Sequence, residues 1–574
     1  AQQSAESARR KSTTKWANYY VNQLKTEKDA KEKARIERIL RNSPDKNMNH
    51  NYMHLNDENG ERCSSDEEVA KQVQKYVVNL LANNYEGTDM TYVKKCLAQE
   101  KVKEKLIDDN QTFGIITEAE VRAVINRAKT GKANIGTSMN AIQLLINWDQ
   151  HNYTERITLL LNNHISGKKI MEDINDVTMM PIPKTKTTTL ASKYRWICIC
   201  HIMQKIMDLI FVKRMQAIVQ NRIGLAQCGF MPGREALDVS MAINRIVSLR
   251  RQKNKPTFIL FADVIGAFPR MSREVMKESL RAFGMGDKGM KWIEAMYDKP
   301  MASTSINGIE NAIQTTAGGI QGAVATPMLY IITKYMCDKA YAARQQEDQQ
   351  VKRLQLRIHR GPAFMSPFAP DKNNPTVEGV YVDGLIYADD EATIAYSLKD
   401  IEYLAIQKTL HNRKFGQQTH VDGKKSRIMV IPGKKETHKE IVPIRMPGSS
   451  EEHFPFTDTM VHIGITYDKD WSFKQHCTKK LIMAEKEWSK SYHILQNESV
   501  EIDTKMKVYE RYILPHLLFG SELYPKNMLA RIIEFHDDCM RKLDGYNSVQ
   551  EMEEDGENMN GVRFDVGDIS MQAH

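Results

Sequence analysis

Residues 380–396 read VYVDGLIYADDEATIAY, a pattern that predicts a β-hairpin with an acidic tip. Two apolar runs, Val380 to Ile386 and Thr393 to Tyr396, flank Tyr387-Ala-Asp-Asp390. Adjacent carboxylates at a strand turn repel each other, and a bound divalent cation removes that repulsion. Taken alone, such a turn is more commonly a solvated hairpin tip, so the prediction of a metal site needs a further acid.

That further acid ends a second hydrophobic strand. Residues 258–263 read FILFAD, and Val264 to Phe268 follow directly. A carboxylate at the end of a buried strand needs a partner, and a metal shared with Asp389 and Asp390 supplies one. Two metals held by such acids activate a hydroxyl and stabilise a leaving pyrophosphate in an in-line displacement. The alternative for Asp263 is an ordinary capping or salt-bridged aspartate.

Length and composition describe a large globular protein. The chain has 574 residues, of which 41% are hydrophobic and 27% charged, so we expect two to four structural subdivisions. The 81 basic residues exceed the 72 acidic ones and give a net charge of +9, which suits a polyanionic partner without demanding one. No apolar run is long enough to predict a membrane span. The chain begins at Ala1 rather than Met, which suggests that an upstream segment was removed.

The eight cysteines are scattered and form no CxxC pair, so a reducing compartment fits best. Cys198, Cys200 and His201 lie close together in the sequence. Their apolar neighbours and the lack of a second ligand pair favour a buried strand over a zinc site.

Helix and strand patterns divide the chain. Residues 15–42 predict an exposed helix, and capping boxes at Ser65 to Glu68 and Thr117 to Glu120 each predict a helix start. Residues 361–375 predict a surface insertion, and residues from about 472 predict helices with a mobile tail after Gln550. Further strands are predicted at Val177 to Ile182, Arg195 to Ile199, Phe258 to Ala262, Val380 to Tyr387 and Ile428 to Ile431.

A set of ordered motifs resembles the reverse transcriptases of non-LTR (LINE-like) retrotransposons over roughly residues 60 to 545. Each motif alone is weak, but accidental matches would not keep the family's order. The matching segments are Pro181 to Lys184, Lys193 to Arg195, Gly229 to Arg234, Asp263 to Phe268, Gly318 to Gly322 with Thr326-Pro327, Tyr387 to Asp390, Lys425-Ser426 with Ile428 to Ile431, His462 to Ile465, and Tyr509 to Tyr524.

The resemblance implies an RNA-directed DNA polymerase with two Mg²⁺ ions, Mn²⁺ being a substitute. It implies an α+β right-hand polymerase with an N-terminal helical extension at 1–110, fingers at 111–250, a palm at 251–470, and a helical thumb and C-terminal tail at 471–574. The implied partners are an RNA template, a primer strand and deoxynucleoside triphosphates.

The resemblance also implies a role for each matched residue. The catalytic residues are Asp263, Asp389, Asp390 and Lys425, the last of which neutralises or protonates the departing pyrophosphate. The implied metal ligands are Asp263, Val264, Asp389 and Asp390. The implied nucleotide-binding residues are Lys184, Arg195, Phe268, Gln321 and Gly322, and the implied template or primer contacts are Gly229, Arg234, His462 and Gly464.

Four positions depart from the family pattern: Trp196, Met231, Pro269 and Ile320. These departures, and the lack of the family's endonuclease segments, leave an alternative open. It is a domesticated, catalytically silent RNA-binding or scaffold subunit of a ribonucleoprotein. The expected location is intracellular, nuclear or cytoplasmic for a mobile element, and mitochondrial for a domesticated protein with a removed presequence.

Overall fold

The computed structural model describes residues 53–545, except 58, 82–86, 149–150, 169–170, 172, 186–187, 298–299, 349–354, 358–378, 382–383 and 434–441. Three sequence predictions lie outside the described residues: the helix at 15–42, the insertion at 361–375 and the tail after Gln550. The chain divides into two compact units, with a boundary between Thr457 and Asp458.

The unit before this boundary contains a group of helices with a shared apolar core. Thr117 starts one of them as predicted, because its hydroxyl accepts a hydrogen bond from the Glu120 N–H while the Glu120 carboxylate accepts one from the Thr117 N–H. The group comprises α4 (Met90–Leu97), α5 (Asp109–Phe113), α6 (Glu118–Arg127), α7 (Met139–Trp148), α8 (Tyr153–Ile165), α9 (Ile202–Arg222), α11 (Arg273–Ala282), α12 (Asp287–Met296) and α13 (Thr326–Asp348).

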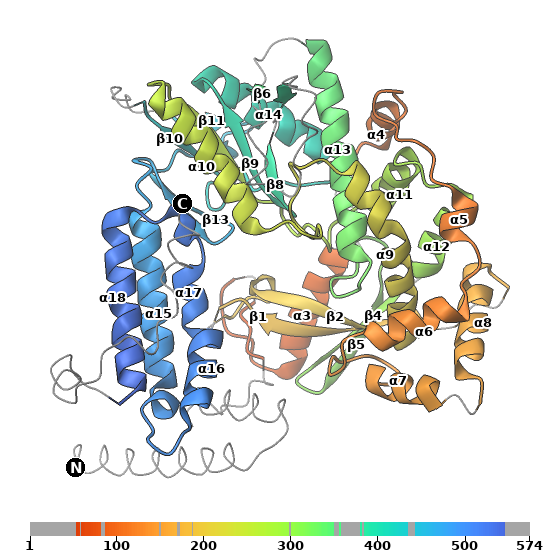
Figure 1. Ribbon diagram of the computed structural model, residues 1–574. Coiled ribbons are helices and arrows are strands. Elements are labelled where there is room, and N and C mark those ends of the chain that lie inside the picture. The colour runs from red at the N-terminus through yellow and green to blue at the C-terminus, as the bar shows by residue number, and fades with distance from the viewer. Residues whose placement is uncertain are drawn as a thin grey trace, which may run out of the picture. The chain divides into compact units, whose positions relative to one another are not determined.

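A four-stranded sheet lies beside these helices, and we call it the β1 sheet (Figure 1). Its order is β2 (Tyr194–Cys200), β1 (Val177–Pro183), β4 (Met301–Ile306) and β5 (Ile309–Gln314), with η2 (Ala191–Lys193) before β2. β1 is antiparallel to β2 and parallel to β4. Helix α3 (Asp66–Leu81) covers β4 and β5 with its predicted apolar face, which includes Val73 and Val77.

The hairpin β4–β5 is missing from the sequence prediction, although its signal is present. Asn307 and Gly308 form the turn, with φ angles of +51° and +88°. An Asn-Gly pair between two strands is the strongest short-range sign of a hairpin, because both residues tolerate positive φ. The flanking strands alternate weakly in hydrophobicity, which hid them from a search for apolar runs.

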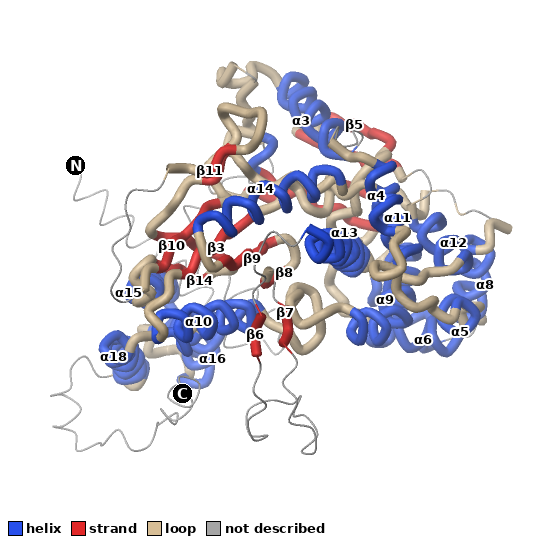
Figure 2. Tube along the Cα trace, turned by 90° about the horizontal axis from the view of Figure 1, so that it is seen from above, coloured by secondary structure: helices blue, strands red, loops and turns tan. Residues whose placement is uncertain are grey.

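The second four-stranded sheet, called the central sheet here, is antiparallel throughout. Its order is β10 (Arg427–Ile431), β3 (Thr257–Ala262), β9 (Asp390–Ala395) and β8 (Leu385–Tyr387). Helix α14 (Leu398–Lys414) packs on β3 and β9, and α10 (Ala236–Gln252) packs on β8 (Figure 2). Phe258, Leu260 and Ile428 of the sheet share an apolar cluster with residues of α14.

The predicted strand at Val380 to Tyr387 is two strands in the structure. β7 (Gly379–Tyr381) pairs with β6 (Gln355–Arg357), whereas β8 begins only at Leu385 and pairs with β9. Gly384 stands before β8, where a Cβ would lie 2.7 Å from the Glu391 carboxylate. The signal for this division is Asp383-Gly384, a turn-type pair inside the run VYVDGLIY that the single-strand prediction passed over. Two short strands, β11 (Ile444–Arg445) and β12 (His453–Phe454), complete this unit.

The unit that follows the boundary is mainly a bundle of helices that lie side by side (Figure 1). Its apolar core includes Cys477, Leu481, Val508 and Ile532, which confirms the helical prediction after residue 472. Its elements are β13 (Thr459–His462), β14 (Ile465–Asp468), α15 (Lys474–Leu495), α16 (Ile502–Tyr512), α17 (Leu514–Leu518), η3 (Ser521–Leu523) and α18 (Lys526–Leu543).

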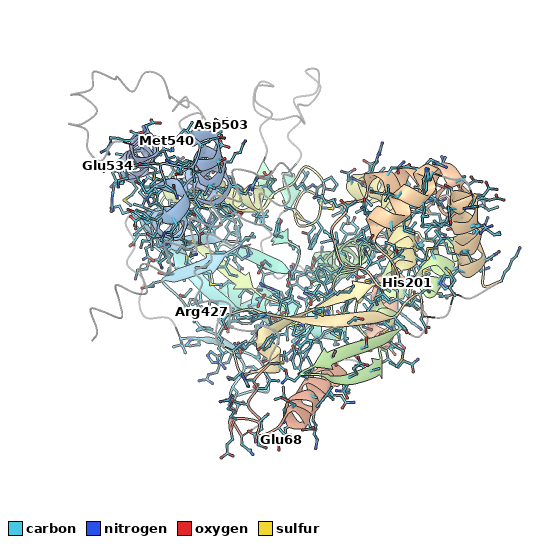
Figure 3. All side chains as sticks on the ribbon, turned by 90° about the horizontal axis from the view of Figure 1, so that it is seen from below. Glu68, His201, Arg427, Asp503, Glu534 and Met540 are labelled. Carbon is cyan, nitrogen blue, oxygen red and sulfur yellow. The ribbon has the colours of Figure 1, made fainter. Side chains whose placement is uncertain are left out.

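The prediction that the Cys198 segment is a buried strand is confirmed. Cys198 and Cys200 are buried in β2, and all eight cysteines carry free thiols. His201, which Figure 3 labels, caps helix α9. Its Nδ1 accepts a hydrogen bond from the Met203 N–H at 3.2 Å. Among the described helices, we find none with the length and apolar character needed to cross a membrane.

Candidate functional site

The structure brings Asp263, Asp389 and Asp390 to one end of the central sheet. Asp263 directly follows β3, and Asp390 begins β9. The two strands pair so that Ala262 lies opposite Glu391, and this register places Asp263, the residue after β3, beside Asp390. Asp389 belongs to the turn that joins β8 to β9. Two strands far apart in the sequence therefore place three carboxylates within electrostatic reach of one another.

This crowding changes the acid strength of the hairpin carboxyls. Burial raises the pKa of Asp390 to about 7, and repulsion from Asp389 and Asp263 adds to the rise. Burial also raises the pKa of Asp389, with a smaller contribution from Asp263 that a backbone hydrogen bond and Lys425 oppose. The positive charge of Lys425 does not offset burial and repulsion, so the pKa values of both carboxyls stay raised.

Lys425 and His420 contact the third acid. The Lys425 ammonium lies 2.6 Å from Asp263 Oδ2, and His420 Nε2 lies 3.5 Å from the same oxygen. The Asp263 backbone is also held, because its N–H donates to the Ser426 hydroxyl at 3.1 Å and its carbonyl accepts from the His420 N–H at 2.9 Å. Lys425, the predicted proton donor, therefore forms an ion pair with Asp263, a predicted metal ligand.

A cluster of cations lies near this end of the sheet. Burial lowers the pKa of Lys184, and the positive charges of Lys425, Arg195 and Lys193 lower it further. Lys184 also donates from Nζ to the Ser192 carbonyl at 2.9 Å, while Arg195 stays exposed on β2. The charges of Lys425 and of Arg195, the other residue of the predicted phosphate-binding pair, therefore act on Lys184.

Phe268 lies in an aromatic group near the acids. Its ring is 5.2 Å from the ring of Tyr330 in an edge-to-face arrangement and 5.8 Å from that of Phe230. Tyr330 is buried on α13, where burial raises its pKa and the negative charge of Asp389 raises it further. Phe268 is therefore fixed by packing beside the carboxylates.

Gln321 and Gly322 lie against the β1 sheet. The Cys198 N–H donates to the Gln321 carbonyl at 2.7 Å. Gly322 has a φ of +130°, and a Cβ there would lie 2.2 Å from the Cys198 carbonyl oxygen, so only glycine fits. The following residues are held by Asp208 of α9, whose carboxylate accepts from the Ala325 N–H at 3.1 Å.

The two matched residues of the 229–234 segment make contacts within the protein. A Cβ on Gly229 would lie 2.1 Å from the Ala388 nitrogen, so this glycine permits close approach to the acidic turn. The Arg234 guanidinium donates to the carbonyls of Gly224, Gln227 and Ile223 at 2.8, 2.7 and 3.2 Å. Arg234 thus organises the loop before α10.

His462 and Gly464 belong to the other unit, and we describe them by themselves. His462 is buried at the end of β13. Gly464 forms the turn to β14 with a φ of +79°, and a Cβ there would lie 3.2 Å from the Phe519 ring. Their roles at a primer strand stay a prediction.

Three of the four departures from the family pattern are buried apolar side chains. Trp196 and Ile320 are 2% and 5% exposed in the core under the β1 sheet, and Met231 is 5% exposed in the helical core. Trp196 also donates from its indole N–H to the Ala191 carbonyl at 3.0 Å. These three side chains pack in the interior of the protein.

The donor set suits a divalent cation that binds oxygen. Three half-buried carboxylates lie together, and the pKa values of Asp389 and Asp390 are raised, chiefly by burial and further by the negative charge of Asp263. Magnesium prefers such oxygens, and it would remove the repulsion. In the geometry of the described residues, no three acidic, His or Cys side chains converge closely enough to hold the ion. The Lys425 ammonium, 2.6 Å from Asp263 Oδ2, would compete with such an ion for this oxygen.

Sequence reasoning missed His420, Asp208 and Gln227. His420 lies five residues before Lys425 and had no motif to mark it. Asp208 sits in the middle of an apolar helix, where a buried acid is a signal that could have been followed. Gln227 precedes the matched Gly229 by two residues, and only the fold reveals its partner, Ala388.

One comparison with known proteins bears on this site. Residues 182–440 match the family described as reverse transcriptase (RNA-dependent DNA polymerase). The match spans all strands of the central sheet, the three acids, Lys425 and the cation cluster. This part of the chain is therefore similar to reverse transcriptases, and all three acids lie within the matched residues.

Proposed function

We propose that this protein is an RNA-directed DNA polymerase that performs two-metal, template-directed nucleotidyl transfer. The observation that carries the proposal is the meeting of three carboxylates and four cations at one end of the central sheet, inside the reverse transcriptase match. Asp263, Asp389, Asp390 and the Val264 carbonyl would hold magnesium. When bound, magnesium supplies Lewis-acid activation of the primer hydroxyl and charge neutralisation at the phosphates.

The remaining side chains bind and orient the substrate. Lys184 and Arg195 bind the triphosphate of an incoming deoxynucleotide, because their charges converge with that of Lys425. Lys425 neutralises the departing pyrophosphate or donates a proton to it. Gln321 and Gly322 border the nascent base pair on the backbone that Cys198 fixes. Phe268 lies under the sugar, where its ring excludes a 2′-hydroxyl.

The wider assignment is a right-hand polymerase. β1 and β2 correspond to fingers, the central sheet and the β4–β5 hairpin to a palm, and the helical bundle to a thumb, with RNA template and primer as partners. In this assignment Gly229 and Arg234 organise the template side through the loop before α10, while His462 and Gly464 contact the primer. Two compact units and a mixed helix-and-sheet fold support this assignment.

Primer extension tests the proposal directly. Purified protein is given a primed RNA template and deoxynucleotides with Mg²⁺ or Mn²⁺, and we expect metal-dependent extension. Absence of extension with both metals on several primed templates would overturn the polymerase function. The silent-scaffold alternative predicts stable RNA binding without extension, so the same preparation distinguishes the two. No observation in the structure favours that alternative, since the buried departures leave the acids intact.

Sugar selection tests the assignment of Phe268. We expect wild-type protein to prefer deoxynucleotides, and Phe268→Ala to incorporate ribonucleotides more readily while retaining deoxynucleotide incorporation. The ratio of kcat/KM for the two sugars measures the effect. Equal incorporation by the wild type would show that Phe268 has another role.

A further inference from the structure

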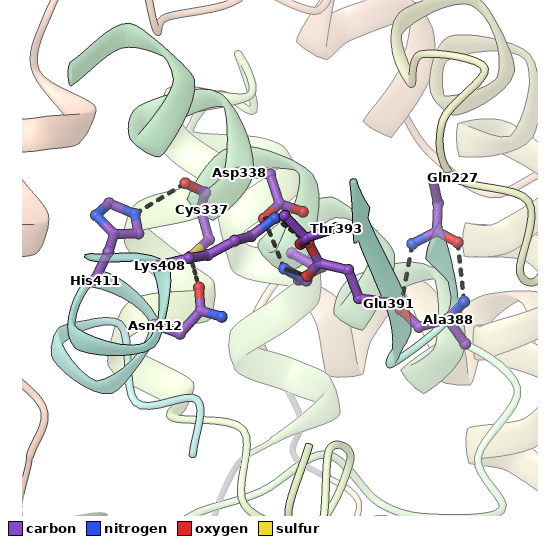
Figure 4. A network of polar contacts seen from close by, with 10 residues as sticks. Gln227, Cys337, Asp338, Ala388, Glu391, Thr393, Lys408, His411 and Asn412 are labelled. Atoms are coloured by element: carbon purple, nitrogen blue, oxygen red, sulfur yellow. Dashed lines mark hydrogen bonds and ion pairs between the residues drawn. The ribbon is translucent and has the colours of Figure 1, made fainter. Parts of the chain in front are cut away.

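The side-chain amide of Gln227 contacts the turn that carries Asp389 and Asp390 (Figure 4). Its Oε1 accepts hydrogen bonds from the Ala388 N–H at 2.9 Å and the Gly229 N–H at 2.8 Å. Its Nε2 donates to the Ala388 carbonyl at 3.3 Å. Gln227 is only 6% exposed, so these bonds replace the water that a free amide would bind.

The turn that Gln227 contacts is strained. Ala388 has a φ of +61°, in the left-handed region that costs a residue with a Cβ about 1–2 kcal/mol. Such a conformation persists when its surroundings fix it. Here the Ile386 N–H donates to the Ala226 carbonyl at 2.7 Å, and the Cys228 N–H donates to the Ile386 carbonyl at 2.8 Å. Two backbone bonds and one side-chain amide therefore fasten residues 226–229 to the hairpin.

Gln227 is itself held in place. The Arg234 guanidinium donates to the Gln227 carbonyl at 2.7 Å, and Gly229 has no Cβ to hold the two segments apart. A chain of contacts thus runs from Arg234 through Gln227 to Ala388. Ala388 immediately precedes the two acids, so its backbone angles set the direction in which their carboxylates point.

We infer that Gln227 is a positioning residue, which holds Ala388 in the left-handed conformation and thereby aims Asp389 and Asp390 at their substrate. The inference rests on the proposed polymerase function, and it assigns Gln227 no contact with substrate. Without the amide, Ala388 would relax toward a right-handed conformation, and the acids would turn with it.

The test compares two buried glutamines. Gln227→Met keeps the length of the side chain and removes all three hydrogen bonds. Gln204→Met is the matched control, because Gln204 is 2% exposed on α9 and its Oε1 accepts no hydrogen bond from the described residues. Steady-state primer extension gives kcat and KM for deoxynucleotides, and amide hydrogen exchange of the peptide spanning 385–391 reports the turn independently of activity.

For Gln227→Met we expect kcat to fall about 10- to 100-fold, the usual effect of removing a group that orients a ligand. KM should change less than about twofold, because the phosphate-binding cations are untouched, and exchange at Ala388 should accelerate about tenfold with the loss of its hydrogen bond. Gln204→Met should leave all three quantities near wild type. Gln227→Glu retains the accepting oxygen, so it should restore slow exchange at Ala388.

Two results would overturn the inference. One is a wild-type exchange rate at Ala388 in Gln227→Met, and the other is a kcat that falls no further than in Gln204→Met. A wild-type protein that extends no primer would instead overturn the polymerase function, while the exchange comparison would still decide whether Gln227 fixes the turn.

Discussion

The pKa values of two neighbouring residues of β9 are shifted in opposite directions. Asp390 has its pKa raised to about 7, because burial and the charges of Asp389 and Asp263 disfavour its ionised form. Burial also raises the pKa of Glu391, but the ammonium groups of Lys334 and Lys408 outweigh burial and hold it well below its usual range. Side chains alternate along a strand, so the two carboxyls face opposite sides of the central sheet.

The Glu391 side of the sheet contains two acids and two lysines, of which Glu391 and both lysines are buried and Asp338 is half-buried (Figure 4). The Glu391 carboxylate pairs with Lys408 of α14 and lies 3.3 Å from the Lys334 ammonium of α13. Lys334 also lies 2.6 Å from Asp338, which is 3.6 Å from Lys408. The Thr393 hydroxyl donates to Glu391 at 3.1 Å. The two lysines and two acids therefore neutralise one another.

The difference separates Glu391, whose charge is neutralised within the protein, from Asp389 and Asp390, to which the proposed function assigns metal binding. Glu391 has its cations built into two helices, and it fastens those helices to the hairpin. For Asp389 and Asp390, the cation that lowers the pKa is Lys425, but its ammonium contacts Asp263 rather than either of them. Carboxylates kept together without enough positive charge are typical of sites that receive a cation or a reacting group.

Loss of one acid of the Asp263, Asp389 and Asp390 group should have the largest effect. We expect Asp389→Asn to lower primer extension on the order of 10³-fold, because a preorganised charge at the reacting phosphate is removed. Affinity for primed RNA should survive, since the cation cluster is unchanged. Extension assays and RNA binding measure the two effects. Asp287→Asn is the control, because its side chain is 91% exposed, and equal activity losses in both variants would contradict the assignment.

On the opposite side we expect a change in stability. Glu391→Gln leaves two buried lysines with one acid, and we expect it to lower the free energy of unfolding by about 3–5 kcal/mol. Denaturant titration measures the loss. Glu402→Gln, on the exposed side of α14, should change it by less than about 0.5 kcal/mol.

A double substitution sharpens this second prediction. Glu391→Met with Lys408→Met removes one ion of each sign and leaves Lys334 paired with Asp338. Most of the lost stability should return, because replacing a buried ion pair with apolar side chains is often neutral. Additive losses would show that these lysines and acids do not act as a set.

Asp208 isolates the effect of burial on a carboxyl pKa, because none of the causes of its shift is a neighbouring charge. Burial raises its pKa to about 7, although the N–H groups of Ala325 and Val324 oppose the rise. The folded state therefore prefers the protonated acid, and wild-type stability should fall as the pH rises from about 4 through about 7. Asp208→Asn should avoid this loss and be more stable at pH 8 by at most about 4 kcal/mol. Parallel pH profiles of unfolding would contradict the assignment.

The smallest effect should come from the exposed ion pair. The Lys425 side chain is 58% exposed, so Lys425→Met should change the free energy of unfolding by no more than about 1 kcal/mol. Lys408→Met, which leaves Glu391 buried without its nearest cation, should cost several times more. Denaturant midpoints compare the two lysines, and equal losses would remove the distinction between the two sides of the sheet.

Some features of the fold follow from local sequence. The alternation and apolar runs at 177–182, 195–199, 258–262 and 428–431 predicted four strands within one residue at each end. Thr117 and Glu120 marked the start of α6 because a capping box acts over one turn. The positions of Asp263, Asp389 and Asp390 at strand ends followed from the same patterns. These features depend on neighbours along the chain, so the sequence by itself determined them.

The tertiary structure decided which of these residues meet. Gln227 lies 161 residues from Ala388, and Lys334 and Lys408 surround Glu391 from two helices. A lysine in a helical pattern predicts a solvated face, and nothing nearby in the chain reveals that α13 and α14 bury both ammonium groups. Opposite pKa shifts at Asp390 and Glu391 arise because the sheet's two sides face different partners, which only the folded chain brings together.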